Sequence, residues 1–390
     1  MGCGDGEENV EITPARALGG AGLPVCLVLE PKPAALRVVA LTVLDRLMVT
    51  FHRAGASRIV VVTGGEELPD IRRARALGIP FEVMETMPAM DGRVVLSGTG
   101  WWGPREEVEQ GMSGATGRWT SDDGEPLGAG VLEGGSPGGL RGLEAMPGIR
   151  IGRRSSRVRD AAEARRAEDR LWSGLSSGAD GMVDRWFNRP VGRWALSRWL
   201  VSTGVSPNHV SLAATAMGLA AAGLFGVPGT GHAMAASVLF QASAVVDCVD
   251  GDIARAVFKE SRLGKWIDLV GDQVVHGAVF AGIATGLSGG RLGYGAWVLG
   301  GLAVWGALAS FGAVLRGMRR PGTASGWMKR WIDGATNRDF SVLVMVLAFA
   351  GRLEWFLWMA AIGGNVFWML VLWEQGQRAG GGGGRGKAGA

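Results

Sequence analysis

Four aspartates recur at short, regular intervals between residues 247 and 272. Asp247 and Asp250 are three residues apart, and Asp268 and Asp272 are four apart, so on helices each pair would share one face. Carboxylates packed this closely cannot all ionise unless cations or protons lie among them. Hard divalent ions such as Mg²⁺ or Mn²⁺ take carboxylate oxygens as ligands and often bind substrate phosphates as well. The spacing therefore predicts an ion site or a proton path.

The aspartates lie at the ends of two apolar runs in the C-terminal part of the chain. Six apolar segments follow Pro207, most of them near the ~20 residues that a membrane-spanning helix needs. A carboxylate in such a segment is costly unless it is paired, so its presence there indicates a function. The fifth segment is short, and a re-entrant pair formed by the last two is the alternative. The predicted segments are residues 209–227, 232–250, 264–288, 293–315, 339–352 and 354–373.

Lys and Arg are concentrated in two of the loops between these segments. The loop after the second segment carries Arg255, Lys259, Arg262 and Lys265, whereas the first loop carries no Lys or Arg. This asymmetry predicts that both termini and the acidic residues face the cytoplasm. Basic residues after the fourth segment are candidates for binding an anionic acceptor, or they anchor to lipid headgroups. These residues are Arg316, Arg319, Arg320, Lys329, Arg330 and Arg338, and the acceptor candidates among them are Arg316, Arg319, Arg320 and Arg338.

Aromatic residues and arginines alternate just before the first apolar segment. This composition is typical of an amphipathic helix that lies in the membrane interface. The charged stretch before it, residues 151–182, is expected to form a solvated linker helix. The interfacial residues are Trp186, Phe187, Trp194, Leu196, Trp199 and Leu200, with Arg185, Arg189, Arg193 and Arg198 between them.

The N-terminal part of the chain, residues 23–150, has the pattern of a soluble α/β domain. The apolar runs "LPVCLVLE" and "SRIVVVTGG" read as strands, and the sequence between them has apolar residues at helical spacing. A strand, a helix and a strand in this order predict a parallel sheet. Residues 92–99 form a third candidate strand, and residues 104–150 are too rich in glycine for elements to be assigned. Residues 1–22 and 376–390 are expected to be flexible or disordered tails.

The acidic stretch resembles the signature of the CDP-alcohol phosphotransferases, also called CDP-alcohol phosphatidyltransferases. In this sequence it reads Asp247-x2-Asp250-Gly251-x2-Ala254-Arg255-x8-Gly264-x3-Asp268-x3-Asp272, and the resemblance extends over roughly residues 180 to 373. It implies a membrane domain of six helices, residues 183–375, that transfers a substituted phosphate from a CDP-alcohol donor to an acceptor hydroxyl and releases CMP.

The resemblance also implies roles for individual residues. Asp247, Asp250 and Asp268 would bind Mg²⁺ or Mn²⁺, with two ions expected, and through them the pyrophosphate. Asp272 would be the general base and an additional metal ligand. Asp252 stands at a variable position and is interpreted as a bystander. A homodimer is implied by the resemblance alone. Arg255 would bind phosphate or pair with a carboxylate, and the residues expected to line the cytidine and diphosphate pocket are Asn208, Gly251, Ala254 and Gly264.

The N-terminal domain resembles the Rossmann-like fold of sugar-nucleotide nucleotidyltransferases, as in fused enzymes that make inositol-phosphodiester solutes. Such enzymes need a glycine-rich loop after their first strand to hold a triphosphate. This chain has Pro31 and Pro33 there, and proline lacks the N–H donor that the loop would supply. The domain is therefore expected to be inactive and to serve docking, stability or regulation.

Two alternative functions and the identity of the acceptor stay open on the sequence. A bifunctional enzyme would make its own CDP-alcohol from CTP, and a cation or proton transporter would also place carboxylates in the membrane. The acceptor could be inositol phosphate, glycerol phosphate, another polyol phosphate or a lipid alcohol, and the fused layout favours a soluble polyol phosphate.

The amino-acid composition argues against two other classes of protein, nucleic-acid-binding proteins and disulfide-rich proteins. The balance of 40 Lys and Arg against 36 Asp and Glu gives no indication of nucleic-acid binding. Three scattered cysteines are too few for a disulfide framework, and the four histidines lack ligand spacing and are interpreted as structural.

Overall fold

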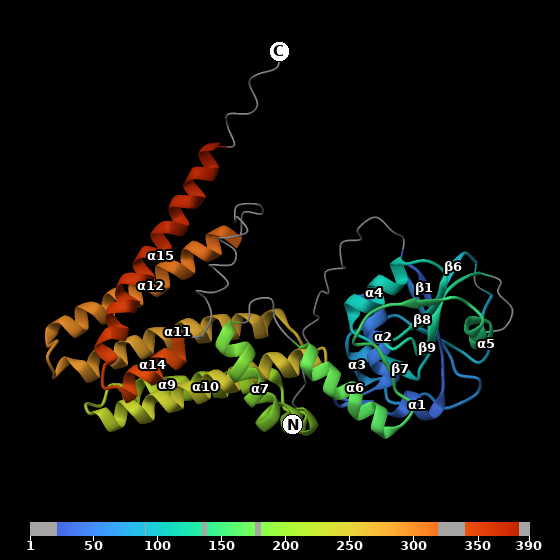
Figure 1. The fold of residues 1–390 in the computed structure, drawn as a ribbon, viewed down its shortest axis with the longest axis horizontal. Coiled ribbons are helices and arrows are strands. Elements are labelled where there is room, and N and C mark those ends of the chain that lie inside the picture. Colours follow the sequence, from blue (N-terminus) through green and yellow to red (C-terminus); the bar gives the residue numbers. More distant parts are fainter. Residues whose placement is uncertain (1–21, 90, 135–138, 176–180, 319–339, 382–390) are drawn as a thin grey trace, which may run out of the picture. The chain divides into compact units, whose positions relative to one another are not determined.

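The computed structural model describes residues 22–89, 91–134, 139–175, 181–318 and 340–381 (Figure 1). The chain divides into two compact units. The first comprises Met1–Leu175 and Arg255–Lys259, and the second comprises Ser176–Ala254 and Glu260–Ala390.

The first unit is an α/β domain built on a seven-stranded mixed sheet with the order β10-β8-β9-β6-β1-β4-β5. β1 lies between β4 and β6 and is parallel to both, while β9 is antiparallel to β6 and β8. The predicted parallel sheet is therefore confirmed for its central strands. The strands are β1 (Pro24–Val28), β4 (Arg58–Val62), β5 (Glu82–Met84), β6 (Arg93–Gly98), β8 (Gly117–Thr120), β9 (Pro126–Glu133) and β10 (Gly148–Arg150).

Helices and two small two-stranded sheets, β2-β3 and β7-β11, complete the first unit. Helix α2 begins because the Thr42 hydroxyl accepts a hydrogen bond from the Asp45 amide at 3.1 Å, which satisfies an N-terminal donor of the helix. Its buried face carries Phe51, which packs at 6.2 Å from the rings of Trp101 and Trp119. The helices are α1 (Pro31–Ala35), α2 (Val43–Arg53), α3 (Arg72–Ala76), α4 (Arg105–Ser113), α5 (Gly139–Glu144) and α6 (Ala161–Gly174), and the short strands are β2 (Arg37–Val38), β3 (Leu41–Thr42), β7 (Trp101–Trp102) and β11 (Ser156–Arg157).

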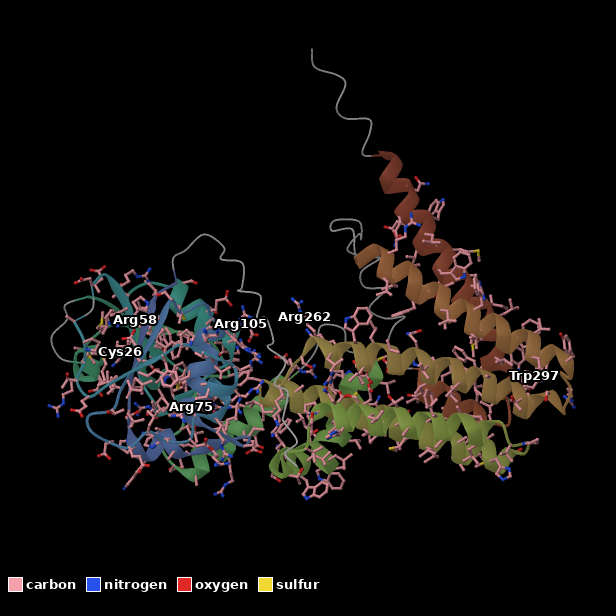
Figure 2. The ribbon with its side chains drawn as sticks, turned by 180° about the vertical axis from the view of Figure 1, so that it is seen from behind. Cys26, Arg58, Arg75, Arg105, Arg262 and Trp297 are labelled. Atoms are coloured by element: carbon pink, nitrogen blue, oxygen red, sulfur yellow. The ribbon has the colours of Figure 1, made fainter. Side chains whose placement is uncertain are left out.

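Among its described residues, the second unit contains five helices that are long and apolar enough to span a membrane. Six spans were predicted; the sixth predicted span corresponds to α15, and the fifth is the ten-residue helix α14 (Phe340–Phe349). Large apolar side chains point outward, as Trp297 does on α12, where 48% of the residue is exposed (Figure 2). The long helices are α9 (Pro207–Phe225), α10 (Thr230–Ala256), α11 (Arg262–Ser288), α12 (Tyr294–Met318) and α15 (Leu353–Gly381).

Helix α14 is short, and one of its faces packs against the bundle. The ring of Phe340 at its start contacts rings from α10, α11 and α15, at 5.7 Å from Phe240, 4.9 Å from His276 and 5.8 Å from Phe356. Val344 and Ala348, further along α14, are fully or almost fully buried. One face of α14 therefore packs into the bundle core, while Leu343, Val346 and Phe349 on its other face are exposed.

A helix with two π-helical stretches precedes α9. It consists of η1 (Asp184–Asn188), α7 (Arg189–Gly192), η2 (Arg193–Ser197) and α8 (Arg198–Thr203), and we call it the interfacial helix. Trp186, Trp194 and Trp199 are 77%, 86% and 63% exposed, whereas Asn188 and Ser197 on the opposite face are completely buried. The amphipathic character predicted for this segment is thus present, with an aromatic outer face.

Candidate metal centre and active site

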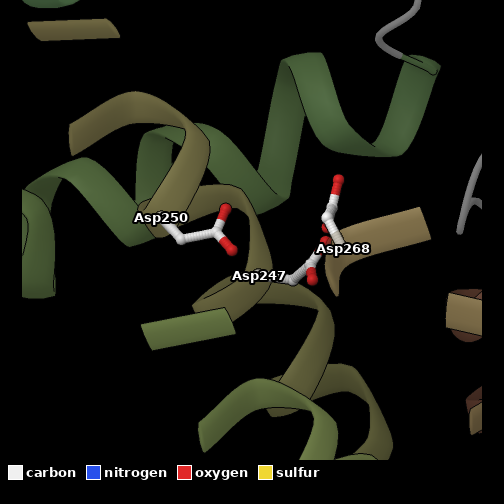
Figure 3. Close-up of side chains that lie close together, drawn as sticks. All are labelled: Asp247, Asp250 and Asp268. Atoms are coloured by element: carbon white, nitrogen blue, oxygen red, sulfur yellow. The ribbon is translucent and has the colours of Figure 1, made fainter. Parts of the chain in front are cut away.

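Three of the four signature aspartates come together at one place in the second unit. One carboxylate oxygen from each of Asp247, Asp250 and Asp268 lies within 4.8 Å of the others (Figure 3). Asp250 is buried, and the other two are half-buried. Two of these side chains come from α10 and one from α11, so the cluster exists only because the two helices lie side by side.

Close packing of α9 against α11 fixes the position of α11. A side chain on Gly282 would lie 2.1 Å from the Ala222 carbonyl oxygen, and one on Gly286 would lie 2.2 Å from that of Phe225. Only glycine allows the two backbones to come this close. At its start, α11 is capped by the Ser261 hydroxyl, which accepts a hydrogen bond from the Gly264 amide at 2.9 Å. These contacts set the register that carries Asp268.

Helix α9 also contributes side chains to the cluster. The Ser211 hydroxyl donates a hydrogen bond to Oδ2 of Asp250. A methyl group on Gly264 would lie 2.9 Å from Oδ1 of Asn208, so the Asn208 side chain rests directly on the start of α11. Two of the residues predicted to line the diphosphate pocket, Asn208 and Gly264, are therefore neighbours.

The remaining predicted site residues lie on the same two helices. Asp272 is half-buried and follows Asp268 by one turn of α11, on the same face. Gly251, Ala254 and Arg255 follow Asp250 in the last turns of α10, and all three are half-buried. Arg316 lies on α12, and the other predicted acceptor-binding residues, Arg319, Arg320 and Arg338, lie outside the described residues.

The donor set of the cluster fits a hard divalent cation. Mg²⁺ and Mn²⁺ prefer oxygen ligands, and the three nearest groups are all carboxylates drawn from two rigid helices. Three carboxylates held this close repel one another unless positive charge lies between them. Asp247, Asp250 and Asp268 would therefore hold the ion, and Asp272 lies one turn away on α11.

Asp252, interpreted from the sequence as a bystander, has a distinct structural position. It is 1% exposed, and its carboxylate accepts hydrogen bonds from Arg189 and Arg193 of the interfacial helix, the latter from Nε at 2.6 Å. These two arginines therefore face α10 and not the lipid headgroups. Their spacing of four residues, opposite the exposed tryptophans, is the signal in the sequence that could have indicated this.

The interfacial helix is tied to α10 by further polar contacts. The Gln241 amide donates to Oδ1 of Asn188 at 2.6 Å, and Asn188 in turn donates to Asp184 at 2.7 Å. A side chain on Gly192 would lie 2.9 Å from Cγ2 of Val249, so the two backbones approach closely there. The helix that bears Asp247 and Asp250 is thus held from a second side.

Comparison with known proteins assigns this part of the chain to a family. Residues 205–373 match the family model described as CDP-alcohol phosphatidyltransferase. The C-terminal half of the chain therefore carries a CDP-alcohol phosphatidyltransferase domain, and all the clustered aspartates lie within it.

Individual relatives agree with this assignment. The chain is 28% identical over 211 residues to the bifunctional IPC transferase and DIPP synthase of Archaeoglobus fulgidus. This match covers 50% of this chain and 39% of that protein. It is 33% identical over 107 residues to the Thermococcus kodakarensis protein of the same name, covering 27% and 23%. It is 36% identical over 92 residues to the phosphatidylinositol phosphate synthase of Streptomyces avermitilis, covering 24% and 37%. These matches span less than two fifths of the relatives' own lengths.

Proposed function

We propose that this chain is a membrane-embedded CDP-alcohol phosphotransferase. It would transfer a substituted phosphate from a CDP-alcohol to an acceptor hydroxyl and release CMP. The observation that carries the proposal is the convergence of Asp247, Asp250 and Asp268 within 4.8 Å, inside the segment that matches the family. Divalent-metal dependence, with Mg²⁺ or Mn²⁺ as the ion, follows from that donor set.

In the proposed reaction, the acceptor oxygen forms a bond to the phosphorus that carries the alcohol. The bond from this phosphorus to the oxygen that bridges it to CMP breaks, and CMP leaves with that oxygen. Bound metal would neutralise charge on the diphosphate. Asp272 would accept the hydroxyl proton, since it lies one turn beyond Asp268 on the same face of α11. Asn208, Gly251, Ala254, Arg255 and Gly264 would line the nucleotide and diphosphate pocket.

We assign no enzymatic activity to the α/β unit. The residues after β1 form the short helix α1, which begins with Pro31, where nucleotidyltransferases need N–H donors. The Glu30 carboxylate lies close to two glycines. A methyl group built on Gly98 would lie 2.8 Å from this carboxylate, and one built on Gly100 would lie 2.9 Å from it. A carboxylate at the carboxyl ends of β1 and β6 would repel a triphosphate. Docking, stability or regulation are the remaining roles.

The placement in the membrane forms part of the proposal. The basic residues at the adjoining ends of α10 and α11 and in the link between them favour a cytoplasmic site, with both termini on that side of the membrane. These residues are Arg255, Lys259, Arg262 and Lys265. The exposed tryptophans of the interfacial helix favour its insertion among lipid headgroups. A homodimer is proposed on the family resemblance alone.

The test is CMP release by the purified full-length chain in lipid nanodiscs. It would be supplied with Mn²⁺ and a panel of radiolabelled CDP-alcohols and acceptors. We expect CMP release that falls by at least about a hundredfold in Asp268→Asn, because the cluster loses a charged ligand. Asp123→Asn, an exposed carboxylate of the α/β unit, serves as the control. No CMP release across the panel would refute the proposal.

Two rival functions have distinct readouts in the same preparation. Pyrophosphate release from CTP would show that the α/β unit makes a CDP-alcohol, as in a bifunctional enzyme. Cation or proton flux into sealed vesicles, without CMP release, would instead support a transporter.

A further inference from the structure

A cavity of about 420 Å³, open on one side, lies between α11, α12, α14 and α15. This volume is in the range of small-molecule sites, which is about 300–1,000 Å³. Five phenylalanines line it, and Gln273, His276 and Ser310 are the polar side chains of its wall. The Ser310 hydroxyl donates to the Gly364 carbonyl at 3.1 Å. The cavity is therefore almost entirely apolar.

His276 supplies an independent indication of a ligand. It lines the cavity and is only 9% exposed, yet within the described residues its Nε2 atom has no hydrogen-bond partner. An imidazole nitrogen buried among apolar groups is costly unless it is paired. A bound molecule with one polar atom near His276 and apolar atoms elsewhere would satisfy it.

The cavity adjoins the acceptor side of the proposed active site. His276 follows Asp272 by four residues on α11, so the two side chains share a face and are about 6 Å apart along the helix axis. Phe280 follows one turn later and also lines the cavity. In the proposed function Asp272 accepts the proton of the acceptor hydroxyl. Asp247, Asp250 and Asp268 instead bind the metal that holds the diphosphate.

We propose that this cavity binds the hydrocarbon chain of a lipid alcohol acceptor, with a polar group of the acceptor hydrogen-bonded to His276. The inference rests on the proposed function. A polyol phosphate would lose hydration here without finding cationic partners, whereas a hydrocarbon chain gains from burial against phenylalanine rings. This reverses the preference for a soluble polyol phosphate that the fused layout suggested, and it gives His276 a role beyond packing.

Gly363 allows the cavity to be filled without disturbing its wall. It lies on α15 and lines the cavity, and a methyl group built there meets no atom within 4 Å. Gly363→Leu would therefore place a side chain in the space proposed for the lipid, and leucine is also the better helix former. Gly301→Leu on α12 is the matched control, because it also points into open space but does not line the cavity.

The experiment compares acceptors in nanodiscs at a fixed CDP-alcohol concentration. The acceptors are a long-chain diacylglycerol, a short-chain diacylglycerol and glycerol 3-phosphate. We expect the wild type to use the long-chain alcohol at least about tenfold better in kcat/KM than the other two, as expected when several methylene groups are bound. Gly363→Leu should lose this preference through a lower kcat/KM for the long-chain alcohol, whereas Gly301→Leu, outside the cavity, should behave as wild type. His276→Leu should raise KM for both diacylglycerols.

A second measurement does not depend on turnover. A long-chain diacylglycerol with a photoreactive chain end should label peptides that contain Phe340 or Phe356, and excess unlabelled diacylglycerol should prevent this. Equal competition by a phospholipid would mean that ordinary bilayer lipid fills the cavity and would overturn the inference. A preference for glycerol 3-phosphate that is unchanged in Gly363→Leu would overturn it while leaving the proposed function standing. Absence of CMP release with every acceptor would refute the proposed function instead.

Discussion

Arg193 of the interfacial helix donates a hydrogen bond from Nε to Oδ2 of Asp252 on α10 at 2.6 Å. The same carboxylate also accepts a hydrogen bond from Arg189, and it is 1% exposed. Asp252 follows the proposed metal ligand Asp250 by two residues. The interfacial helix and the acidic end of α10 are therefore joined by a buried, charged contact.

Neutralising Asp252 alone should lower the stability of the protein. Asp252→Asn leaves two arginines without their shared carboxylate, and breaking a buried ion pair in this way costs about 3–5 kcal/mol. We expect a clear drop in the unfolding temperature in detergent and a higher Mn²⁺ concentration for half-maximal CMP release. The triple variant Asp252→Leu, Arg189→Met, Arg193→Met removes the three charges of this contact together and should recover much of the stability. Equal stability of Asp252→Asn and wild type would contradict this reasoning.

Metal removal should stop the proposed reaction reversibly. Chelation with EDTA is expected to abolish CMP release, and added Mn²⁺ should restore it, because Asp247, Asp250 and Asp268 form the proposed ion site. Asp247→Asn should shift the Mn²⁺ titration to higher concentration by about tenfold or more, as the site loses a charged ligand. An unchanged titration would mean that Asp247 does not bind the ion.

Gly264 tests the proposed nucleotide pocket separately from the metal. In Gly264→Ala the added methyl carbon would lie 2.9 Å from Oδ1 of Asn208 and 3.0 Å from the Ser261 hydroxyl that caps α11. We expect KM for the CDP-alcohol to rise about tenfold, with a loss of stability of about 1 kcal/mol from the disturbed cap. Gly295→Ala on α12, which opens into empty space, is the control. An unchanged KM for the CDP-alcohol would mean that Asn208 and Gly264 do not line the nucleotide pocket.

Cys26 offers a pH-dependent test of the α/β unit. It lies in the central strand β1 (Figure 2), and burial raises the pKa of its thiol to about 11. In the unfolded chain the thiol ionises near pH 9. Burial of the neutral thiol therefore contributes fully to the free energy of unfolding below pH 9, and this contribution is lost as the pH rises towards 11. Maleimide labelling of Cys26 at neutral pH should be slow in the folded chain and fast in urea. Rapid labelling of the folded chain would contradict its burial.

The sequence correctly predicted the strands and helices in which apolar residues recur at regular strand or helix spacing. β1, α2 and β4 follow the predicted strand, helix and strand, and β6 (Arg93–Gly98) matches the candidate strand at residues 92–99. Residues 104–150 gave no assignment, although they form β8, β9 and β10. The reason is steric, because a side chain on Gly130 would lie 2.3 Å from the Gly117 carbonyl oxygen. Glycine is required there, and it removes the alternation by which strands are recognised.

The aspartate spacing indicated a shared site, but it could not indicate what holds the helices in place. Asp252 and Arg189 are 63 residues apart, so nothing in the local sequence joins them. The cavity beside His276 is likewise formed by four helices, and no single segment encodes it. Such features depend on which helix faces meet, and the order of residues along each helix does not specify this.

The backbone contact between α9 and α11 bears on the transporter hypothesis. Transport by alternating access needs groups of helices to rock against one another around a central site. Here the carbonyl oxygens of Ala222 and Phe225 occupy the space that side chains would fill at Gly282 and Gly286. Sliding of either helix would break this interlock and displace Asp268 along with α11. The arrangement is suited to a static scaffold that brings substrates to fixed carboxylates.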